Sequence, residues 1–379
     1  MKLELKKEKK ERPPIIHFIP MPSIGASVTA LLTEPAAPQR TPVIFALRSS
    51  NEMLNHFDIS SVIGQGSFAT IHKIQHIDTK QQLAAKAMKK SRVGENDIRQ
   101  EQDIMTRMHH PNIVNLLMTF ESPNRVIFVM DLCDGGSLLQ RLERTGRESF
   151  PENVVRHIIR STTEAIAYLH SLNIVHRDVK PENILFTKPH DESVIKLADF
   201  GLSTSCISSG ERLTTVCGSH AYLSPEIVRC ERGEIDDYDS SIDMWGVGLV
   251  GYMAYFGMNP FLREQRVETY SAILSAEPFI PKKGDASRDM LDLIAVLLSK
   301  TPSLRPSAKQ VLCRVCFREM PPSPPSPRSI LLDPEEEDNI LLSSPYKTKG
   351  FNSSSFAEKF RRSLGIGSGR NSPKYRHSS

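Results

Sequence analysis

The chain has 379 residues, of which 39% are hydrophobic, and a formal net charge of +4. This length allows one to three domains with a large buried core, and the composition is that of an ordinary globular protein. Residues 347–379 contain eight lysines and arginines against the single acid Glu358, so the rest of the chain is slightly acidic. A body without a basic excess argues against a protein that coats nucleic acid, and we expect no nucleic-acid partner.

Six cysteines are too few in a chain of this length to form a disulfide framework. The single C-x-x-C pair, Cys313 and Cys316, lacks a second pair with which to bind zinc. We therefore expect reduced thiols and a cytoplasmic or nuclear protein. No apolar run reaches the roughly 20 residues of a membrane-spanning helix, and we expect no membrane partner.

Composition divides the chain into three parts. Residues 1–52 mix charges, prolines and unpatterned apolar residues, and residues 319–379 are rich in serine, proline and basic residues. We expect both flanks to be disordered. The region between them, 53–318, is long for a single core and suggests two lobes, an N-lobe at 53–132 and a C-lobe at 137–318.

Short runs rich in β-branched and aromatic residues predict antiparallel strands in the N-lobe. From Ser137 onward the apolar residues recur at steps of three and four, clearest at 152–170, and this spacing predicts helices. The predicted fold class is α+β, with a small antiparallel sheet and one main helix followed by a larger, mostly helical lobe. The strands are expected at 57–63, 70–77, 82–88, 115–120 and 126–132, and the helix of the N-lobe at 96–108.

The stretch IGQGSFATI, residues 63–71, contains a G-x-G pattern with Ala69 where a third glycine would stand. The pattern alone fits either a dinucleotide fold or the lid of a kinase. A dinucleotide fold needs a helix directly after the glycines and an acid about 20 residues further on. Here a strand follows, and the residue at that distance is the basic Lys86. The stretch therefore favours a hairpin over a phosphate chain, with Gly64 and Gly66 supplying backbone freedom.

HRDVKPEN, residues 176–183, is the most specific segment, and it resembles the catalytic loop of the eukaryotic protein kinase family. The resemblance implies that Asp178 orients or accepts the proton of the attacking hydroxyl, Lys180 neutralises the γ-phosphate, and Asn183 binds magnesium. Asp199 in KLADFGLS follows 21 positions after Asp178 and is a second carboxylate suited to Mg²⁺. With these segments in this order, residues 57–317 resemble the eukaryotic protein kinase family.

The resemblance implies an enzyme that binds ATP and Mg²⁺ between its lobes. Lys86 matches the lysine that pairs with the α and β phosphates, and Glu101 matches the helix glutamate that holds this lysine. Phe200 and Gly201 follow the metal-binding Asp199 and belong to the structural set of the family. The nucleotide-binding residues implied are Ile63, Gly64, Gly66, Ile71, Ala84, Lys86, Met130, Asp131, Cys133 and Leu185.

Further residues match the family's structural and regulatory positions. Glu226 in SPE matches a glutamate that pairs with an arginine, here Arg305, and Asp243 matches a helix aspartate that binds the catalytic loop. Arg177 beside Asp178 implies control by a phosphate on the segment 199–226. Its candidate acceptors are Thr214 and Thr215.

Lys180, two positions after Asp178, resembles serine/threonine kinases, and CGSHAYLSPE resembles the calcium/calmodulin-dependent group. We therefore expect a protein serine/threonine kinase. Its substrates would carry arginine upstream of the acceptor, although Ser137 stands where the group commonly has an acid and only Glu182 is kept. A catalytically inactive scaffold is the alternative. A basic amphipathic stretch at 356–364 fits calmodulin, and a solvated, phosphorylatable tail is the competing interpretation.

Overall fold

The computed structural model describes residues 43–46, 50–66, 68–146, 149–190, 193–206, 212–279 and 287–314. Two compact units are present, one formed by residues up to Val93 with Leu116–Met130, and the other by Gly94–Asn115 with the residues from Asp131 onward. Within the described ranges, no helix is both long and apolar enough to cross a bilayer. Residues 1–42 and 315–379, which include most of both predicted flanks, lie outside the described residues.

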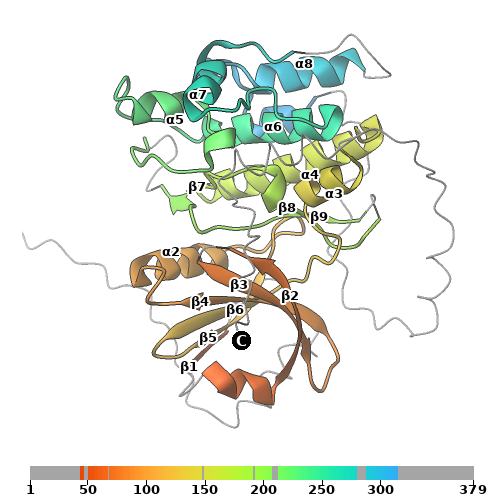
Figure 1. Cartoon of the computed structure of the whole chain (residues 1–379), viewed down its shortest axis with the longest axis vertical. Helices are drawn as coiled ribbons and strands as arrows, with labels where there is room; N and C mark the ends of the chain where they lie inside the picture. Colours follow the sequence, from red (N-terminus) through yellow and green to blue (C-terminus); the bar gives the residue numbers. More distant parts are fainter. Residues whose placement is uncertain are drawn as a thin grey trace, which may run out of the picture. The chain divides into compact units, whose positions relative to one another are not determined.

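The first unit contains a six-stranded sheet in the order β1-β5-β6-β4-β3-β2 (Figure 1). Strands β2 to β6 are antiparallel to their neighbours, which confirms the predicted sheet. They form where β-branched and aromatic residues are concentrated, since such side chains pack well on a pleated surface. The five are β2 (Phe57–Gln65), β3 (Ala69–His76), β4 (Gln82–Lys89), β5 (Leu116–Glu121) and β6 (Arg125–Met130).

The prediction that residues 1–52 are disordered is wrong for the end of that segment. β1 (Val43–Ala46) pairs in parallel with β5, with Val43 opposite Met118 and Ala46 opposite Glu121. The short helix η1 (Ser50–Asn55) follows, and its Met53 is buried against the sheet. A four-residue apolar run shows no alternation, and its pairing partner lies some seventy residues away, so the local pattern could not identify it.

The second unit begins with α2 (Glu95–Thr106), close to the predicted 96–108, but this helix does not group with the sheet as the predicted N-lobe boundary assumed. Its side chains bind later parts of the second unit. The Gln100 amide donates to the Ser203 carbonyl (2.8 Å), and the Arg107 guanidinium donates to the Ser205 hydroxyl (2.9 Å). Contacts distant in sequence thus decide where α2 belongs.

The core of the second unit is α6 (Ser241–Phe256), which is buried on nearly all sides. The apolar face of α4 (Glu152–Ser171) packs on it, and the predicted helix at 152–170 is confirmed. Gly246 is required on α6, because a Cβ atom there would lie 2.6 Å from Cβ of Val179. The remaining helices are α3 (Leu138–Arg144), α5 (Pro225–Glu231), α7 (Arg266–Ser275), α8 (Arg288–Leu297) and α9 (Ala308–Leu312), with η2 (Pro181–Asn183), η3 (His220–Tyr222) and η4 (Pro302–Leu304).

Two short ladders carry the functional segments of this unit. β8 (Ile184–Phe186) pairs with β9 (Ile195–Leu197), and β7 (Ile174–Val175) pairs with β10 (Thr204–Ser205). Each ladder joins the HRDVKPEN segment to the segment that contains Asp199. The two predicted motifs are therefore adjacent in the second unit.

Acid should destabilise the second unit through His110. Its Nδ1 accepts the backbone N–H of Asn112 (3.1 Å), its ring stacks on Tyr168, and burial lowers its pKa from 6.5 to about 4. The unfolded chain binds a proton at higher pH than the folded one, so stability falls as the pH drops from about 6.5 toward 4. In His110→Asn the amide oxygen can still accept the Asn112 N–H, and the loss between pH 7 and 5 should shrink. Urea midpoints at both pH values measure this, and identical losses in both proteins would contradict it.

Candidate active site

The HRDVKPEN segment is held in place by a buried carboxylate of α6. Asp243 Oδ2 accepts the backbone N–H of His176 and the Nε2 of His170, and Oδ1 accepts the N–H of Arg177, each at 2.9 Å. Arg177 has a φ of 67°, a left-handed conformation that is costly for a residue with a side chain. Burial alone would raise the pKa of Asp243, but the hydrogen bond and charge of His170, followed by those of His176, hold it below its usual value. The predicted bond between this helix and the catalytic loop is present.

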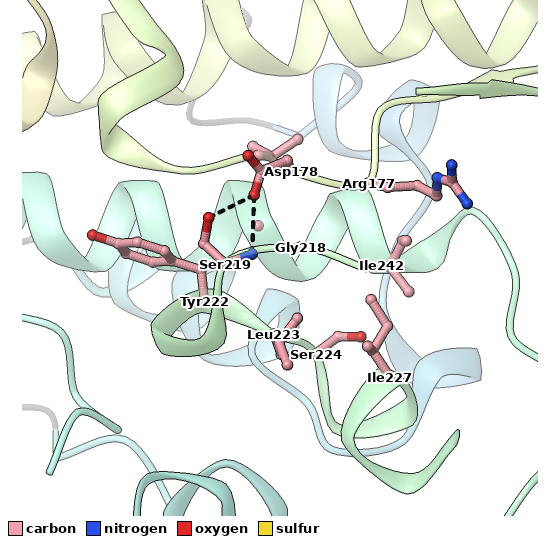
Figure 2. A pocket seen from close by; sticks show the side chains of 11 residues that line it. Arg177, Asp178, Gly218, Ser219, Tyr222, Leu223, Ser224, Ile227 and Ile242 are labelled. Carbon is pink, nitrogen blue, oxygen red and sulfur yellow. Dashed lines mark hydrogen bonds between the residues drawn. The ribbon is translucent and has the colours of Figure 1, made fainter. Parts of the chain in front are cut away.

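Asp178 is 7% exposed and has hydrogen-bond donors on both carboxylate oxygens. Lys180 Nζ donates to Oδ2 (2.5 Å), and the backbone N–H and hydroxyl of Ser219 both donate to Oδ1 (3.2 and 3.1 Å; Figure 2). Lys180 also donates to the Ser219 hydroxyl (2.6 Å). A carboxylate fixed in this way can orient a substrate hydroxyl and take its proton, because charge and direction are set before the substrate arrives.

Asn183 and Asp199 lie at the same end of the β8–β9 ladder. The Asn183 amide nitrogen donates to the carbonyl of Asp178 (2.9 Å), which leaves its Oδ1 directed elsewhere, and Ala198 N–H donates to the Asn183 carbonyl (2.9 Å). Asp199 follows Ala198 with a φ of 66°. The two predicted metal ligands are thus brought together by backbone pairing, and both supply oxygen, the ligand that Mg²⁺ prefers.

Phe200 and Gly201 lie where the predicted structural set expects them. Phe200 is 1% exposed and meets the edge of the His176 ring, with centroids 5.0 Å apart. A Cβ atom at Gly201 would lie 3.6 Å from Asp199 Oδ1 and 3.8 Å from Glu101 Oε2. The α2 glutamate is therefore buried next to the Asp199 segment, within the second unit.

The nucleotide-binding residues expected in the first unit share one face of its sheet. Ile71 lies opposite Lys86, and Ala84 lies opposite Met130, while Ala84 and Lys86 are two positions apart on β4. Residues that pair directly or stand two apart point to the same side of a sheet. The opposite face carries the buried cluster around Met53, so these four side chains lie away from that core.

The glycine stretch is a hairpin, as predicted, closed by a hydrogen bond from Gly66 N–H to the Ala69 carbonyl (2.9 Å). Neither Gly64 nor Gly66 adopts a positive φ, and the backbone freedom expected of them stays a prediction. A Cβ atom at Gly64 would lie 3.4 Å from the Ile71 side chain, an ordinary contact distance. Ile63 lies at one of the two bulges of β2 and is 39% exposed.

The expected hinge residues differ in what their side chains do. Asp131 Oδ2 accepts from the Asn115 amide (2.8 Å) and is paired with Lys196 Nζ (3.0 Å), so this carboxylate has a structural role. Burial raises the pKa of Cys133 to about 12, which leaves it a thiol. Leu185 is half-buried on β8 opposite Lys196.

Lys196 was missed by the sequence analysis. It is 2% exposed, and besides Asp131 it donates to the carbonyls of Pro111 (2.9 Å) and Ile113 (3.1 Å). The signal in the sequence was a lysine inside the apolar strand VIKLADF, because a buried lysine must be paired.

The family model described as the protein kinase domain matches residues 57–317 of this chain. The chain belongs to the protein kinase family. It is 34% identical over 261 residues to a probable myosin light chain kinase of Dictyostelium discoideum, covering 68% of this chain and 82% of that protein. It is 33% identical over 301 residues to bovine serine/threonine-protein kinase H1, covering 77% and 68%.

A third relative is human calcium/calmodulin-dependent protein kinase type IV, 32% identical over 302 residues, which cover 78% of this chain and 62% of that protein. These names agree with the predicted likeness to the calcium/calmodulin-dependent group. The protein is a serine/threonine kinase that transfers the γ-phosphate of ATP to hydroxyls of proteins.

A buried ion pair between Arg305 and Glu226 holds helix α5 of the kinase in place. Arg305, with a fully buried side chain, donates to both carboxylate oxygens of Glu226 (2.5 and 2.8 Å), and its Nε donates to the Ser299 carbonyl (2.9 Å). The pairing expected from the sequence is thus present. Its parallel geometry suits a guanidinium and a carboxylate.

The segment after Asp199 is attached to the kinase at several points. Leu213 and Tyr238 exchange two backbone hydrogen bonds of 2.8 Å, Arg212 is paired with Asp237 (2.7 Å) and Asp239 (3.0 Å), and the Tyr238 hydroxyl donates to the Thr215 carbonyl. The predicted regulatory residues Thr214 and Thr215 are exposed.

Arg177, the third predicted regulatory residue, donates to the Leu202 carbonyl (2.5 Å) and points away from Asp178 (Figure 2). Ser219, which binds both Asp178 and Lys180, was not assigned a role by the sequence analysis. A serine in a loop carries no local signal for such contacts.

Proposed function

We propose that Asp178, Lys180 and Asn183 carry the phosphoryl transfer, with ATP as donor and Mg²⁺ as cofactor. The arrangement that supports this is the fixed Asp178 carboxylate between Lys180 and Ser219. A hydroxyl beside Asp178 would be oriented for attack, while the ammonium of Lys180 is placed to balance negative charge on the group in transfer.

Asn183 and Asp199 fit Mg²⁺ as its protein ligands. Mg²⁺ takes oxygen ligands and is commonly bound by one or two carboxylates together with substrate phosphates. The Asn183 amide nitrogen is held by the Asp178 carbonyl, so the amide oxygen is the atom available to a cation. The metal would supply charge neutralisation of the phosphates.

The proposal is tested by transfer of labelled phosphate from ATP to basic peptides by the wild type, Asp178→Asn and Lys86→Met. We expect strong labelling by the wild type alone, because the variants lack the carboxylate at the hydroxyl and the cation at the phosphates. Equal labelling by all three proteins would overturn the assignment. Binding of Mg·ATP by the wild type without transfer to any peptide would favour the inactive scaffold.

Glu182 is proposed to select substrates with arginine upstream of the acceptor. Its Oε1 accepts the Tyr222 hydroxyl (3.0 Å), while its Oε2 is buried without a hydrogen bond from the described residues. Burial raises the pKa of this carboxyl. A buried carboxylate oxygen without a donor suits a guanidinium, which would supply both charge and hydrogen bonds.

For this selection we expect Glu182→Gln to lower the preference for arginine over alanine at the upstream positions by about tenfold, the value of one charged hydrogen bond. The ratio of kcat/KM for the paired peptides measures it. The alanine peptide is the internal control, since its rate should change little. An unchanged ratio would remove Glu182 from this role.

Phosphorylation of Thr214 or Thr215 is proposed to order the segment after Asp199. Burial raises the pKa values of Cys217 and Tyr238, and the positive charge of Arg177 acts on both in the opposite direction, so Arg177 lies near them. The Tyr238 hydroxyl donates to the Thr215 carbonyl. A phosphate added here would find Arg177 nearby as a partner. Phosphate mapping of the active protein, with Thr214→Ala and Thr215→Ala, identifies the acceptor.

Calmodulin is a weaker candidate partner. Its support is the name of one relative and the basic stretch 356–364, which lies outside the described residues. Adding Ca²⁺ and calmodulin to the peptide assay tests it, and an unchanged rate without binding would leave the tail as a phosphorylatable segment.

We also propose a cytoplasmic or nuclear location, supported by the free thiols of Cys133, Cys217, Cys230 and Cys313 and tested by cell fractionation.

A further inference from the structure

Two basic residues stand opposite each other at one end of the sheet in the first unit. Lys89 is the last residue of β4, and Arg125 is the first residue of β6. The two are direct partners in the antiparallel ladder, so their side chains lie on the same face of the sheet. Like charges placed directly opposite each other repel and destabilise the pairing of the strands. This basic pair therefore lowers stability unless an anion binds to it.

Arg92 adds a third positive charge close to this pair. The chain turns directly after β4, and the Arg92 N–H returns to the Lys89 carbonyl (2.9 Å). The Lys90 N–H donates to the carbonyl of Asn124, the residue before Arg125 (3.1 Å). These backbone bonds hold Lys89, Arg92 and Arg125 near one another, and we call these three residues the basic patch.

The basic patch faces solvent with its charge unbalanced. All three residues are exposed, and in the described part of the chain no ion pair or side-chain hydrogen bond reaches them. Glu121 lies opposite Val126, the residue after Arg125, but its carboxylate is paired with Lys90 (2.7 Å). A group of three like charges attracts a ligand with several charges of the opposite sign.

The chain itself carries a segment of matching charge. Residues 333–338, DPEEED, contain five acids and no basic residue, and they lie outside the described residues. Residues 315–332 connect this acidic run to Arg314, the last described residue. A connection of this length can span up to about 60 Å, several times the ~13 Å radius of gyration of a folded unit of about 100 residues. The connection also keeps the acidic run at a high effective concentration near the folded chain, so that weak contacts suffice.

We propose that the acidic run 333–338 docks on the basic patch of its own chain, where its carboxylates pair with Lys89, Arg92 and Arg125. Ion pairs at an exposed surface are individually weak, so several must form together to hold a segment. The competing partner for the acidic run is the basic end of the tail, residues 347–379, which has eight lysines and arginines.

A carbodiimide that joins carboxylates directly to amines tests this docking in the full chain, with the linked peptides identified by mass spectrometry. Lys309 is the matched control, because it is exposed on α9 and is much closer along the chain to the acidic run. Random encounters should therefore favour Lys309. At low salt we expect links from 333–338 to Lys89 to exceed those to Lys309 by about 3- to 100-fold, the range for three exposed ion pairs. In about 1 M NaCl the preference should disappear, because the screening length falls to about 3 Å.

Two variants test whether the charge of the basic patch causes the preference. Arg125→Glu leaves Lys89 available to the reagent but reverses a charge beside it, and should reduce the links to Lys89 to the level of those to Lys309. Adding Glu336→Arg to Arg125→Glu provides a pair of opposite charges again and should restore part of the preference, while other acids of the run remain to react. Thermal unfolding shows whether each variant is folded.

Equal linking to Lys89 and Lys309 at low salt would overturn the proposal, as would links from the acidic run to the lysines of 347–379 alone. A mixture of ¹⁵N-labelled and unlabelled chains separates links within one chain from links between two. Links to Lys89 confined to chains of one label would support the proposal. Links that join a labelled chain to an unlabelled one would show docking between copies and would contradict docking within one chain.

Discussion

Asp178→Asn is expected to lower kcat by about 100- to 10,000-fold, the range attributed to a positioned general base. Asparagine has the same shape, but it cannot take the proton of the acceptor hydroxyl and it removes the charge that Lys180 balances. The Ser219 N–H and hydroxyl can still donate to the amide oxygen, so the loop should keep its place. The loss should therefore appear in kcat rather than in the KM for ATP.

Steady-state kinetics with a basic peptide measure this loss, and thermal unfolding shows whether the variant is folded. Asp289→Asn, at an exposed position in the first turn of α8, makes the same chemical change away from the catalytic loop and should retain full activity. A value of kcat for Asp178→Asn within tenfold of the wild type, in a folded protein, would contradict the role given to this carboxylate.

Arg305→Met is expected to lower the free energy of unfolding by about 3–5 kcal/mol, because it leaves the Glu226 carboxylate buried without its counter-ion. Glu226 is 3% exposed, so water cannot replace the guanidinium. Adding Glu226→Gln to Arg305→Met removes the stranded charge and should recover part of the loss. Arg305→Lys should also be destabilising, since an ammonium cannot reproduce the two parallel hydrogen bonds.

Urea unfolding of the single and double variants gives these differences and their coupling. Arg288→Met is the matched control, since Arg288 pairs with Asp292 at 3.7 Å on the surface and an exposed pair contributes little. Equal stability of Arg305→Met and Arg288→Met would mean that the buried pair does not hold α5 in place.

The sequence predicted the strands β2 to β6 and the long helix α4 to within a few residues, because their alternating or helical apolar spacing is local. It also assigned Asp178, Asn183 and Asp199 to one site from short segments, and the pairing of β8 with β9 brings Asn183 and Asp199 to the same end of one ladder. The roles of Lys196 and Ser219 were not predicted, because their partners lie far away along the chain. The lysine contacts Asp131 and Pro111, and the serine contacts Asp178, and these distances in sequence are spanned only in the folded protein.

The placement of α2 shows the same limit. Its residues predict a helix, but only the contacts of Gln100 and Arg107 with the segment near Ser203 decide with which unit it groups. The hairpin of the glycine stretch was predicted correctly, while the backbone freedom expected of its glycines stays a prediction. Neither the φ of Gly64 nor its 3.4 Å approach to Ile71 requires a glycine at this position.

Strand β1 has a consequence for how much of the chain makes up the folding unit. The family match starts at Phe57, yet β5 has β1 as a neighbour on the side away from β6. A protein trimmed to the family boundary would leave the outer N–H and C=O groups of β5 as an open edge, the kind of surface on which two chains can join strand to strand. The four residues Val43–Ala46 replace the six-residue edge of β5 by a shorter edge, and the folded sheet of this kinase begins upstream of its family signature.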